Sequence, residues 1–181
     1  MTVERTDLVD QILAAAVAGI GGARRDGQLT MAAEVERTFD GGGHLLVQAG
    51  TGTGKSLGYL APVLARLASD PEARIVIATA TLALQAQLAG KDIPAAVAAC
   101  QSVTGLHIEH AVLKGRSNYA CLLKVRDGQG SEQDALVPDA TASSQLGAEV
   151  VALRGWAEEQ AESGELADRD DAPPHSPQAW A

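Results

Sequence analysis

Residues 49–56 read A-G-T-G-T-G-K-S and lie between the apolar run 45–47 and a segment with helical leucine spacing that begins at Leu57. An apolar run, a glycine-rich turn and a helix start, in this order, are typical of a phosphate-binding loop. Glycines allow the backbone to direct its N–H groups at phosphate oxygens, and the positive end of the following helix adds to the same anion site. The stretch therefore predicts binding of a nucleoside triphosphate.

The residue types in this loop have distinct predicted roles. Lys55 brings a positive charge to the β- and γ-phosphates and the Ser56 hydroxyl is a ligand for Mg²⁺, so these two are the predicted catalytic residues. The usual G-x-x-x-x-G-K-[ST] pattern begins with glycine, whereas this loop begins with Ala49. The alternative is a glycine-rich turn with a chance Lys-Ser pair. The predicted phosphate and magnesium site consists of Ala49, Gly50, Thr51, Gly52, Thr53, Gly54, Lys55 and Ser56.

Apolar runs and helical patterns alternate through the first two thirds of the chain. Helical spacing of apolar residues predicts helices over residues 7–20, 28–39, 57–69, 81–89 and 94–101. Runs rich in β-branched or other apolar residues predict buried strands over residues 44–48, 74–80 and 108–113. Strands that alternate with helices form parallel β-α-β units, and ligands bind at the carboxyl ends of such strands. We therefore expect an α/β fold with the loop at that edge of the sheet.

Charge is distributed unevenly over the 181 residues, whose formal net charge is −9. Up to Arg126 there are 12 basic and 11 acidic side chains, whereas from Asp127 onward there are 2 basic and 12 acidic ones. The acidic excess therefore belongs to the last third, and the net charge does not exclude nucleic acid as a partner of the first part. A small basic cluster precedes the change; its members are Lys114, Arg116, Lys124 and Arg126.

The last third of the chain has its own character. Residues 145–160 predict one helix, because Leu146, Val150, Leu153 and Trp156 share a face at helical spacing. Residues 161–181 are acidic and then proline-rich, which predicts a mobile or disordered end.

Three observations favour a cytoplasmic protein without a membrane segment. The chain has no apolar run of the roughly 20 residues that a transmembrane helix needs. Its first residues lack the basic-then-apolar order of a secretory signal. The two cysteines, Cys100 and Cys121, do not form a disulfide framework, which favours a reducing compartment.

Polar residues outside the loop suggest two further contacts. Gln28 offers a donor and an acceptor together, which suits the edge of adenine, although a surface glutamine near a helix start is the simpler interpretation. Thr79, Thr81 and Gln85 follow the second predicted strand and suit contact with a nucleic-acid phosphate. The alternative for this group is that Thr81 only caps the next helix.

Together, residues 24–121 resemble the start of an iron–sulfur DNA helicase of the XPD/DinG branch of superfamily 2. R-D-G-Q, which ends at Gln28, together with Met31 resembles the adenine-reading motif of that family, which gives that role to Gln28, and the loop resembles its motif I. T-A-T-L-A-L-Q-A-Q-L resembles motif Ia, which implies contact between single-stranded DNA and Thr79, Thr81 and Gln85. K-G-R-S-N-Y-A-C resembles the stretch that carries the first cysteine ligand of a [4Fe–4S] cluster, which is Cys121 in this chain.

The resemblance implies a domain organisation and an activity. Residues 1–113 are expected to be part of a RecA-like P-loop NTPase domain, in which helices flank a parallel β-sheet. Residues 114–181 are expected to be the incomplete start of an iron–sulfur insertion with a helical or disordered acidic tail. The implied activity of a complete protein is unwinding of DNA in the 5′→3′ direction, driven by ATP and Mg²⁺, in repair or replication.

The chain also departs from the family pattern. No cysteine follows Cys121, although the cluster needs three more, and neither the acidic motif II nor a second motor domain is present. We therefore expect a fragment that binds ATP without unwinding DNA. Two alternatives of other classes remain, a self-contained P-loop small-molecule kinase and a non-enzymatic ATP-binding decoy.

Overall fold

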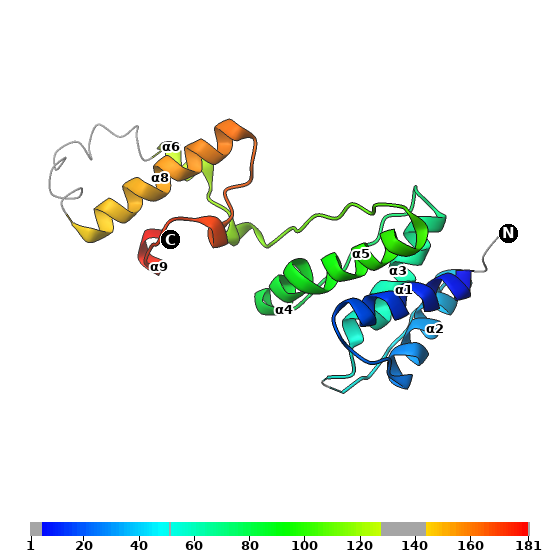
Figure 1. Ribbon diagram of the computed structural model, residues 1–181. Helices are drawn as coiled ribbons and strands as arrows, with labels where there is room; N and C mark the ends of the chain where they lie inside the picture. Colours follow the sequence, from blue (N-terminus) through cyan, green and yellow to red (C-terminus); the bar gives the residue numbers. More distant parts are fainter. Residues whose placement is uncertain (1–4, 51, 128–143, 181) are drawn as a thin grey trace. The chain divides into compact units, whose positions relative to one another are not determined.

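The computed structural model describes residues 5–50, 52–127 and 144–180. The described chain forms two compact units, Met1–Val112 and Leu113–Ala181, which we call the N-terminal unit and the C-terminal unit (Figure 1). Each unit has its own helices and its own network of contacts. None of the described helices is long and apolar enough to cross a membrane.

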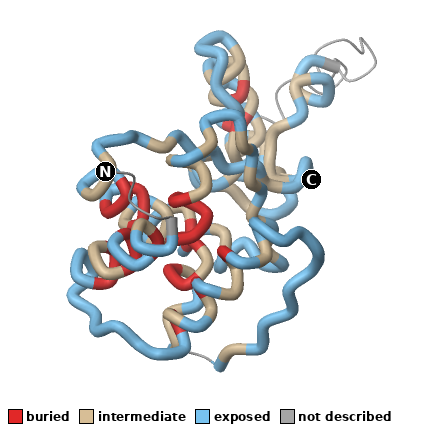
Figure 2. Tube along the Cα trace, turned by 90° about the vertical axis from the view of Figure 1, so that its right-hand side faces the viewer, coloured by how far each residue is buried: buried red, intermediate tan, exposed pale blue. Residues whose placement is uncertain are grey.

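The N-terminal unit is a cluster of helices joined by extended segments (Figure 1). Its core lies where the apolar faces of several helices meet, and Figure 2 shows the buried stretches gathered in the middle of the unit. The helical elements are α1 (Arg5–Gly19), α2 (Asp26–Gly41), α3 (Lys55–Ser69), α4 (Leu82–Gln87), the π-helical turn η1 (Leu88–Asp92) and α5 (Ile93–Thr104). These bounds agree with the helices that the sequence predicts to within a few residues.

Four of these helices contribute to one core, three of them with an apolar face and α2 with Ala32. The buried side chains recur every three or four positions, which places them on the same side of each helix. They include Val9, Ile12, Leu13 and Val17 of α1, Leu57, Leu60 and Leu64 of α3, and Ala96, Val97 and Cys100 of α5. The fourth helix, α2, packs closely on α3 at Gly58, where a Cβ atom would lie only 3.3 Å from Met31 Sδ. A small residue at this position therefore sets the distance between the two helices.

A wide turn interrupts the helical run between α4 and α5. The N–H of Ile93 donates to the carbonyl of Leu88, a span of five residues that defines a π-helical turn. Pro94 follows directly; it has no N–H to donate, and its ring clashes with the carbonyl four residues earlier in a regular helix. The π-helical turn thus lies directly before the one residue of this run that a regular helix interior accommodates poorly.

The predicted parallel β-sheet is wrong. Residues 44–48, 74–80 and 108–113 contain no β-strand, and among the described residues strand-type pairing is limited to an isolated antiparallel bridge between Tyr119 and Asp168. The described structure is therefore helical, which corrects the expected α/β class.

The burial of these segments explains why they do not pair. Parallel strands are stable when neighbours lie at their edges and helices cover both faces of the sheet. Exposure alternates along residues 74–80: Ile77 packs against the helical core, whereas Val76 is 89% exposed. Leu46 is likewise 95% exposed. Since the helices of this unit pack on one another, they cover one side of the apolar runs, and no described element covers the other side.

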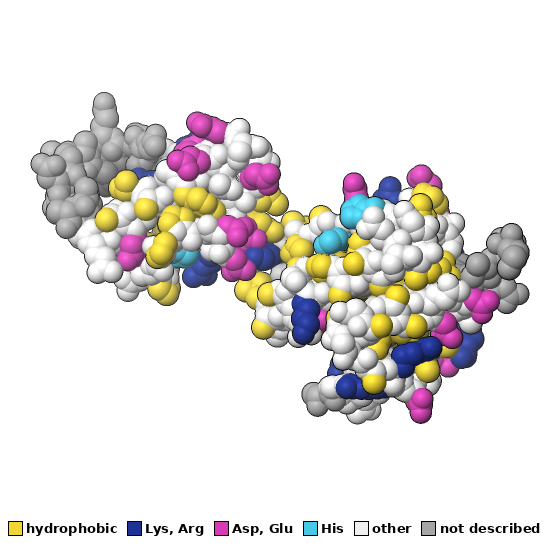
Figure 3. Space-filling model, viewed as in Figure 1, with side chains coloured by type: hydrophobic (Ala, Val, Ile, Leu, Met, Phe, Trp, Pro, Cys, Tyr) yellow, Lys and Arg dark blue, Asp and Glu magenta, His cyan; other side chains and the backbone are white. Residues whose placement is uncertain are grey.

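The C-terminal unit consists of short turns held against one longer helix. Its elements are η2 (Arg116–Asn118), α6 (Leu122–Asp127), α8 (Gln145–Ser163), η4 (Arg169–Asp171) and α9 (Pro177–Trp180). Ser144 caps α8, because its hydroxyl accepts from the N–H of Gly147 at 3.0 Å. Acidic side chains (magenta) stand on the surface of this unit in Figure 3, in accord with the charge of the last third of the chain.

Ion pairs and polar contacts connect the two ends of this unit. Lys114 Nζ lies 2.6 Å from a carboxylate oxygen of Asp168 and 2.6 Å from one of Asp170. Although partial burial lowers the pKa of Lys114, the hydrogen bonds to both carboxylates raise it above its usual value. The indole Nε1 of Trp180 donates to the carbonyl of Ser117 at 3.0 Å. Residues 166–180, for which the sequence predicts mobility, thus contact the segment around Lys114.

Two glutamates of α8 make further polar contacts. Glu158 accepts two hydrogen bonds from the guanidinium of Arg126, at 3.1 and 3.0 Å, and these hold the pKa of Glu158 below its usual value. Glu149 accepts from the N–H of Ser176 at 2.9 Å, and hydrogen bonding to Ser176 holds the pKa of Glu149 below its usual value as well. A carboxyl group whose pKa is lowered by folding stabilises the folded state above its unfolded pKa, and this contribution is lost as the pH falls through the folded pKa.

We predict that acid loosens the C-terminal unit through these two glutamates. Both tryptophans of the chain, Trp156 and Trp180, belong to this unit, so tryptophan emission reports on it alone. Glu158→Gln should lower its resistance to urea at neutral pH, and the difference from wild type should disappear as the pH falls below the usual glutamate pKa of 4.5. The control is Glu159→Gln, which changes an exposed neighbour. Equal effects of both variants at neutral pH would contradict the prediction.

Candidate functional site

The glycine-rich turn before α3 requires glycine at two of its described positions. Gly52 and Gly54 have φ angles of +74° and +76°, a left-handed region that favours glycine. Thr53 Oγ1 donates to the carbonyl of Gly50 at 2.9 Å and so closes the turn on itself. Thr51, which belongs to the predicted site, lies outside the described residues.

The ammonium group of Lys55 lies at the turn. Its Nζ donates to the carbonyl of Ala49 at 3.0 Å and to that of Gly50 at 2.9 Å, while the side chain remains exposed. Lys55 is also the first residue of α3, so the charge stands where the helix N-terminus has its unpaired N–H groups. An ammonium with three donors has one proton left for a further acceptor. The turn therefore presents a positive centre to an anion.

Ser56 follows in the first turn of α3 and is half-buried. Its hydroxyl is in hydrogen-bond contact with Tyr59, one helical turn further along. Burial raises the pKa of the Tyr59 phenol, the hydrogen bond from Ser56 lowers it, and the carboxylate of Asp92 raises it again. The phenol is therefore protonated at neutral pH, and the Ser56 oxygen keeps a lone pair for a metal ion.

Gln28 connects α2 to the turn. Its side chain is 5% exposed, and Nε2 donates to the carbonyl of Gly54 at 3.1 Å. The same carbonyl accepts the N–H of Gly58 at 3.2 Å, so both of its lone pairs are used. The other end of the Gln28 amide is buried, and Oε1 has no partner among the described residues. A buried acceptor without a donor is costly and points to a ligand or water as its partner.

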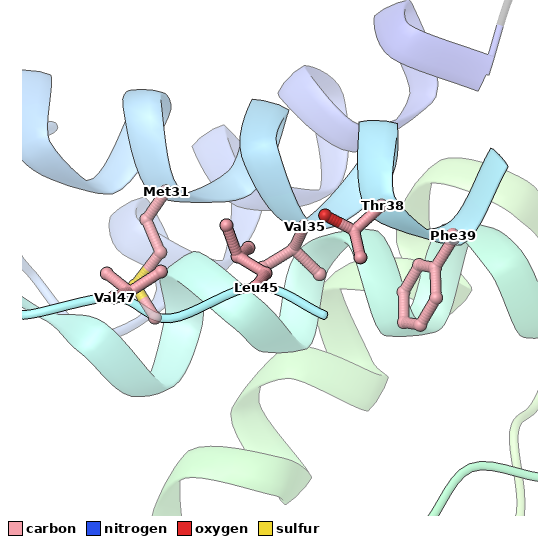
Figure 4. A pocket seen from close by; sticks show the side chains of 6 residues that line it. All are labelled: Met31, Val35, Thr38, Phe39, Leu45 and Val47. Carbon is pink, nitrogen blue, oxygen red and sulfur yellow. The ribbon is translucent and has the colours of Figure 1, made fainter. Parts of the chain in front are cut away.

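Two adjoining cavities lie between α2 and the extended segment before the turn. The larger, of about 400 Å³, has Lys55, Gly50 and Thr53 at one end and Gln28 and Glu34 along α2. The smaller, of about 250 Å³, is mainly apolar (Figure 4). It is lined by Met31, Val35, Thr38, Phe39, Leu45 and Val47. Met31 and Val47 belong to both linings, so the two cavities form one groove that leads away from Lys55.

The structure brings together most of the predicted loop and Gln28, and it adds residues that the sequence analysis missed. Met31, which the resemblance to the adenine-reading motif includes, lines the groove together with Glu34 and Val47, which belong to none of the quoted motifs. Their signal is spacing: Met31 and Glu34 follow Gln28 at intervals of three residues on α2 and so share a flank with it. Val47 belongs to the apolar run before the loop, for which the sequence predicts only a buried strand.

The predicted nucleic-acid contacts lie away from this groove. Thr81 Oγ1 accepts from the N–H of Leu84 at 3.3 Å, as the capping alternative predicts, and Thr79 Oγ1 donates to the carbonyl of Thr81 at 3.2 Å. Gln85 is half-buried on α4. These three residues lie at the start of α4, and they are not among the residues that line either cavity.

The cysteines differ in their surroundings. Cys121 is exposed and precedes α6, whereas Cys100 is fully buried in the core of the N-terminal unit, where burial raises the pKa of its thiol and a hydrogen bond with Thr104 lowers it. In the described ranges there is no group of three or more His, Cys, Asp or Glu side chains that could hold a metal ion. Cys121 alone does not fit a [4Fe–4S] cluster, which needs four thiolates.

Comparisons with known proteins agree on one family. Residues 27–122 match the model of the family described as DEAD/DEAH box helicase. The chain is 45% identical over 172 residues to a protein named ATP-dependent helicase DinG from Mycobacterium tuberculosis, covering 92% of this chain and 25% of the relative. It is 39% identical over 132 residues to ATP-dependent DNA helicase YoaA of Escherichia coli, covering 73% of this chain and 18% of the relative.

A third relative carries a different name. The chain is 36% identical over 114 residues to a protein named 3′-5′ exonuclease DinG from Bacillus subtilis, covering 63% of this chain and 12% of the relative. The chain thus spans about a quarter or less of the length of the relatives that it matches. No solved structure matches it.

The contact between Gln28 and Gly54 predicts a specific effect of substitution. A Cβ atom at Gly54 would lie 1.9 Å from Gln28 Nε2 and 2.7 Å from Cδ, whereas a Cβ at Gly52 has open space. Both glycines have left-handed φ angles, so Gly52→Ala costs about 1–2 kcal/mol of backbone strain alone. Gly54→Ala should cost about 1–3 kcal/mol more, because it also displaces a buried amide from its hydrogen bond.

Urea unfolding of the ligand-free protein, followed by far-ultraviolet circular dichroism, measures this difference. The double variant Gln28→Ala/Gly54→Ala should recover part of the additional loss, since the shorter side chain leaves room for the new methyl group. Equal destabilisation by Gly52→Ala and Gly54→Ala, or no recovery in the double variant, would show that the contact is unimportant.

Proposed function

The chain belongs to the DEAD/DEAH box helicase family, and on this premise we propose that it binds ATP with Mg²⁺ as the nucleotide-binding part of an ATP-dependent DNA helicase. The observation that carries the proposal is the Lys55 ammonium, which bonds to the carbonyls of the glycine turn and lines the 400 Å³ cavity together with Gly50 and Thr53. Cavities of this size and mixed lining are typical of small-ligand sites.

The proposed roles follow from the donors and acceptors at the turn. The triphosphate displaces the carbonyls of Ala49 and Gly50 from Lys55 Nζ and also meets the N–H groups at the start of α3. Ser56 supplies one oxygen to Mg²⁺, which in turn neutralises phosphate charge. Gln28 retains Oε1 as an acceptor for the adenine amino group, since Nε2 is already engaged by Gly54.

Family membership favours this proposal over the P-loop kinase alternative. The described loop and groove account for nucleotide binding, and the proposal for the chain itself is limited to that step. Unwinding of DNA in the 5′→3′ direction, in repair or replication, is proposed for a complete protein of this family. The resemblance of motif Ia supports single-stranded DNA as the partner, with Thr79, Thr81 and Gln85 near the strand.

We predict that Lys55→Ala weakens the binding of ATP in the presence of Mg²⁺ by about 10- to 100-fold, because charge-assisted hydrogen bonds to phosphate contribute about 1.5–3 kcal/mol each. Isothermal titration calorimetry on the purified chain provides the dissociation constant. Lys91→Ala is the matched control, since Lys91 is exposed on η1 and does not line the groove. Absence of binding by the wild-type protein, or equal binding by Lys55→Ala, would refute the proposed function.

The C-terminal unit carries a separate proposal, that Cys121 is one ligand of an iron–sulfur cluster completed by residues outside this chain. Its support is the resemblance of K-G-R-S-N-Y-A-C to the ligand-bearing stretch of the family, together with the exposure of this thiol. On this proposal residues 1–113 belong to the motor domain and residues 114–181 to the cluster-bearing insertion.

The cluster proposal predicts a different outcome for each cysteine. In a longer protein that continues past Ala181, purified without oxygen, Cys121→Ser should lower the iron content and the visible absorbance of the cluster. Cys100→Ser should leave both unchanged, because Cys100 is buried in the core of the other unit. Unchanged iron content in Cys121→Ser would exclude this ligand.

A further inference from the structure

The segment 166–180 of the C-terminal unit, which we call the acidic strap, lies along the turn that begins at Lys114. Near one end of the strap, the N–H of Ala120 donates to the carbonyl of Ala167 at 2.9 Å. At the other end, the indole of Trp180 donates to a carbonyl of the turn at 3.0 Å. The strap is therefore attached near both of its ends.

Two carboxylates of the strap contact one cation of the turn. Lys114 Nζ lies 2.6 Å from a carboxylate oxygen of Asp168 and 2.6 Å from one of Asp170, and the lysine side chain is only 13% exposed. One positive charge is thus opposed by two negative charges. Asp168 also accepts from the backbone N–H of Asp170 at 3.1 Å, whereas the side chain of Asp170 is 66% exposed. Since exposed ion pairs contribute little to stability, the carboxylate of Asp170 is better explained by its effect on Lys114.

The same pattern occurs at a second member of the basic cluster. The guanidinium of Arg126 donates to both carboxylate oxygens of Glu158, at 3.1 and 3.0 Å. Arg116 is exposed, and its side chain makes no ion pair in the part of the chain that the structure describes. Figure 3 shows acidic (magenta) and basic (dark blue) side chains next to one another on this unit. The acidic last third of the chain thus neutralises cations of the basic cluster that precedes it.

Carboxylates in these positions resemble the phosphates of a nucleic-acid strand. Ammonium and guanidinium groups bind carboxylate and phosphate oxygens with the same donors, and a guanidinium contacts either group with two parallel hydrogen bonds. A strand that meets several cations at once also gains from the release of its counterions. Single ion pairs at a surface lack this gain, so a strand competes well against them.

We propose that the acidic strap is an autoinhibitory contact: its carboxylates occupy a phosphate-binding surface formed by the basic cluster, and single-stranded DNA binds there when it displaces them. This inference rests on the DNA partner proposed above and adds a contact surface in the C-terminal unit. It does not depend on the nucleotide site. Arg116, which is exposed, provides the first contact for the strand, and Lys114 joins once the strap releases it.

Fluorescence anisotropy of a labelled oligothymidylate, titrated with the purified chain in the absence of nucleotide, tests the inference. Asp168→Asn/Asp170→Asn should bind about tenfold more tightly than wild type, since Lys114 gains a charge-assisted hydrogen bond to phosphate. Its plot of log affinity against log salt concentration should be steeper by about 0.7, the value for one more phosphate contact on a single strand. The matched control is Glu165→Gln/Asp171→Asn, which removes two exposed carboxylates of the same unit that form no ion pair among the described residues. It should change the affinity by about twofold at most.

A third substitution shows whether Lys114 carries the gain. Adding Lys114→Gln to the double strap variant should return the affinity to that of wild type. Asp170→Asn alone serves if tryptophan emission shows that the double variant loosens the unit, and it should bind about threefold more tightly.

Two results would overturn the inference: equal gains in the strap and control variants, or a gain that survives Lys114→Gln. Absence of DNA binding in every variant would overturn it as well. Each of these results leaves the nucleotide proposal intact, because the titration contains no nucleotide and ATP binding is measured separately through Lys55→Ala.

Discussion

The carbonyl oxygen of Gly54 connects the packing of the helices in the N-terminal unit to the loop of the candidate site. It accepts the N–H of Gly58, which begins the hydrogen bonding of α3, and the amide of Gln28, which comes from α2. One backbone group thus fixes the start of one helix and the approach of another. Gly58 lies one turn further along α3, and a Cβ atom there would meet Met31 Sδ at 3.3 Å, so α2 stays close to α3 beyond this contact.

Local patterns in the sequence predicted the helices and the loop well. Helical spacing of Ile12, Leu60 and Val97 reflects a preference that each segment satisfies by burying one face, so a short window contains the necessary information. A β-sheet, in contrast, depends on pairing between segments that are distant in the chain, and a short stretch of sequence does not show whether such partners are present. Residues 74–80 have the composition of a buried strand, yet with cover on one side they lie unpaired along the helices.

The candidate site shows the same division. Glycine positions and the Lys-Ser pair are dictated by phosphate chemistry, so the motif located the turn and its charge. The orientation of Gln28 could not be deduced, because it depends on how α2 packs against a glycine 26 residues later in the chain. Glu34 became visible as a lining residue only in the folded groove, since a glutamate on a helix is ordinary in sequence.

The π-helical turn at Leu88–Asp92 affects how α5 is rotated about its own axis. Each residue of an α-helix advances about 100° around the axis, so one extra residue in a turn rotates everything that follows by a comparable angle. The side of α5 that holds Cys100 therefore meets α1 and α3 through a phase shift introduced upstream, next to Pro94. Because Pro94 has no amide proton, the turn before it is wide, and this turn determines which side of the twelve-residue helix α5 faces the core.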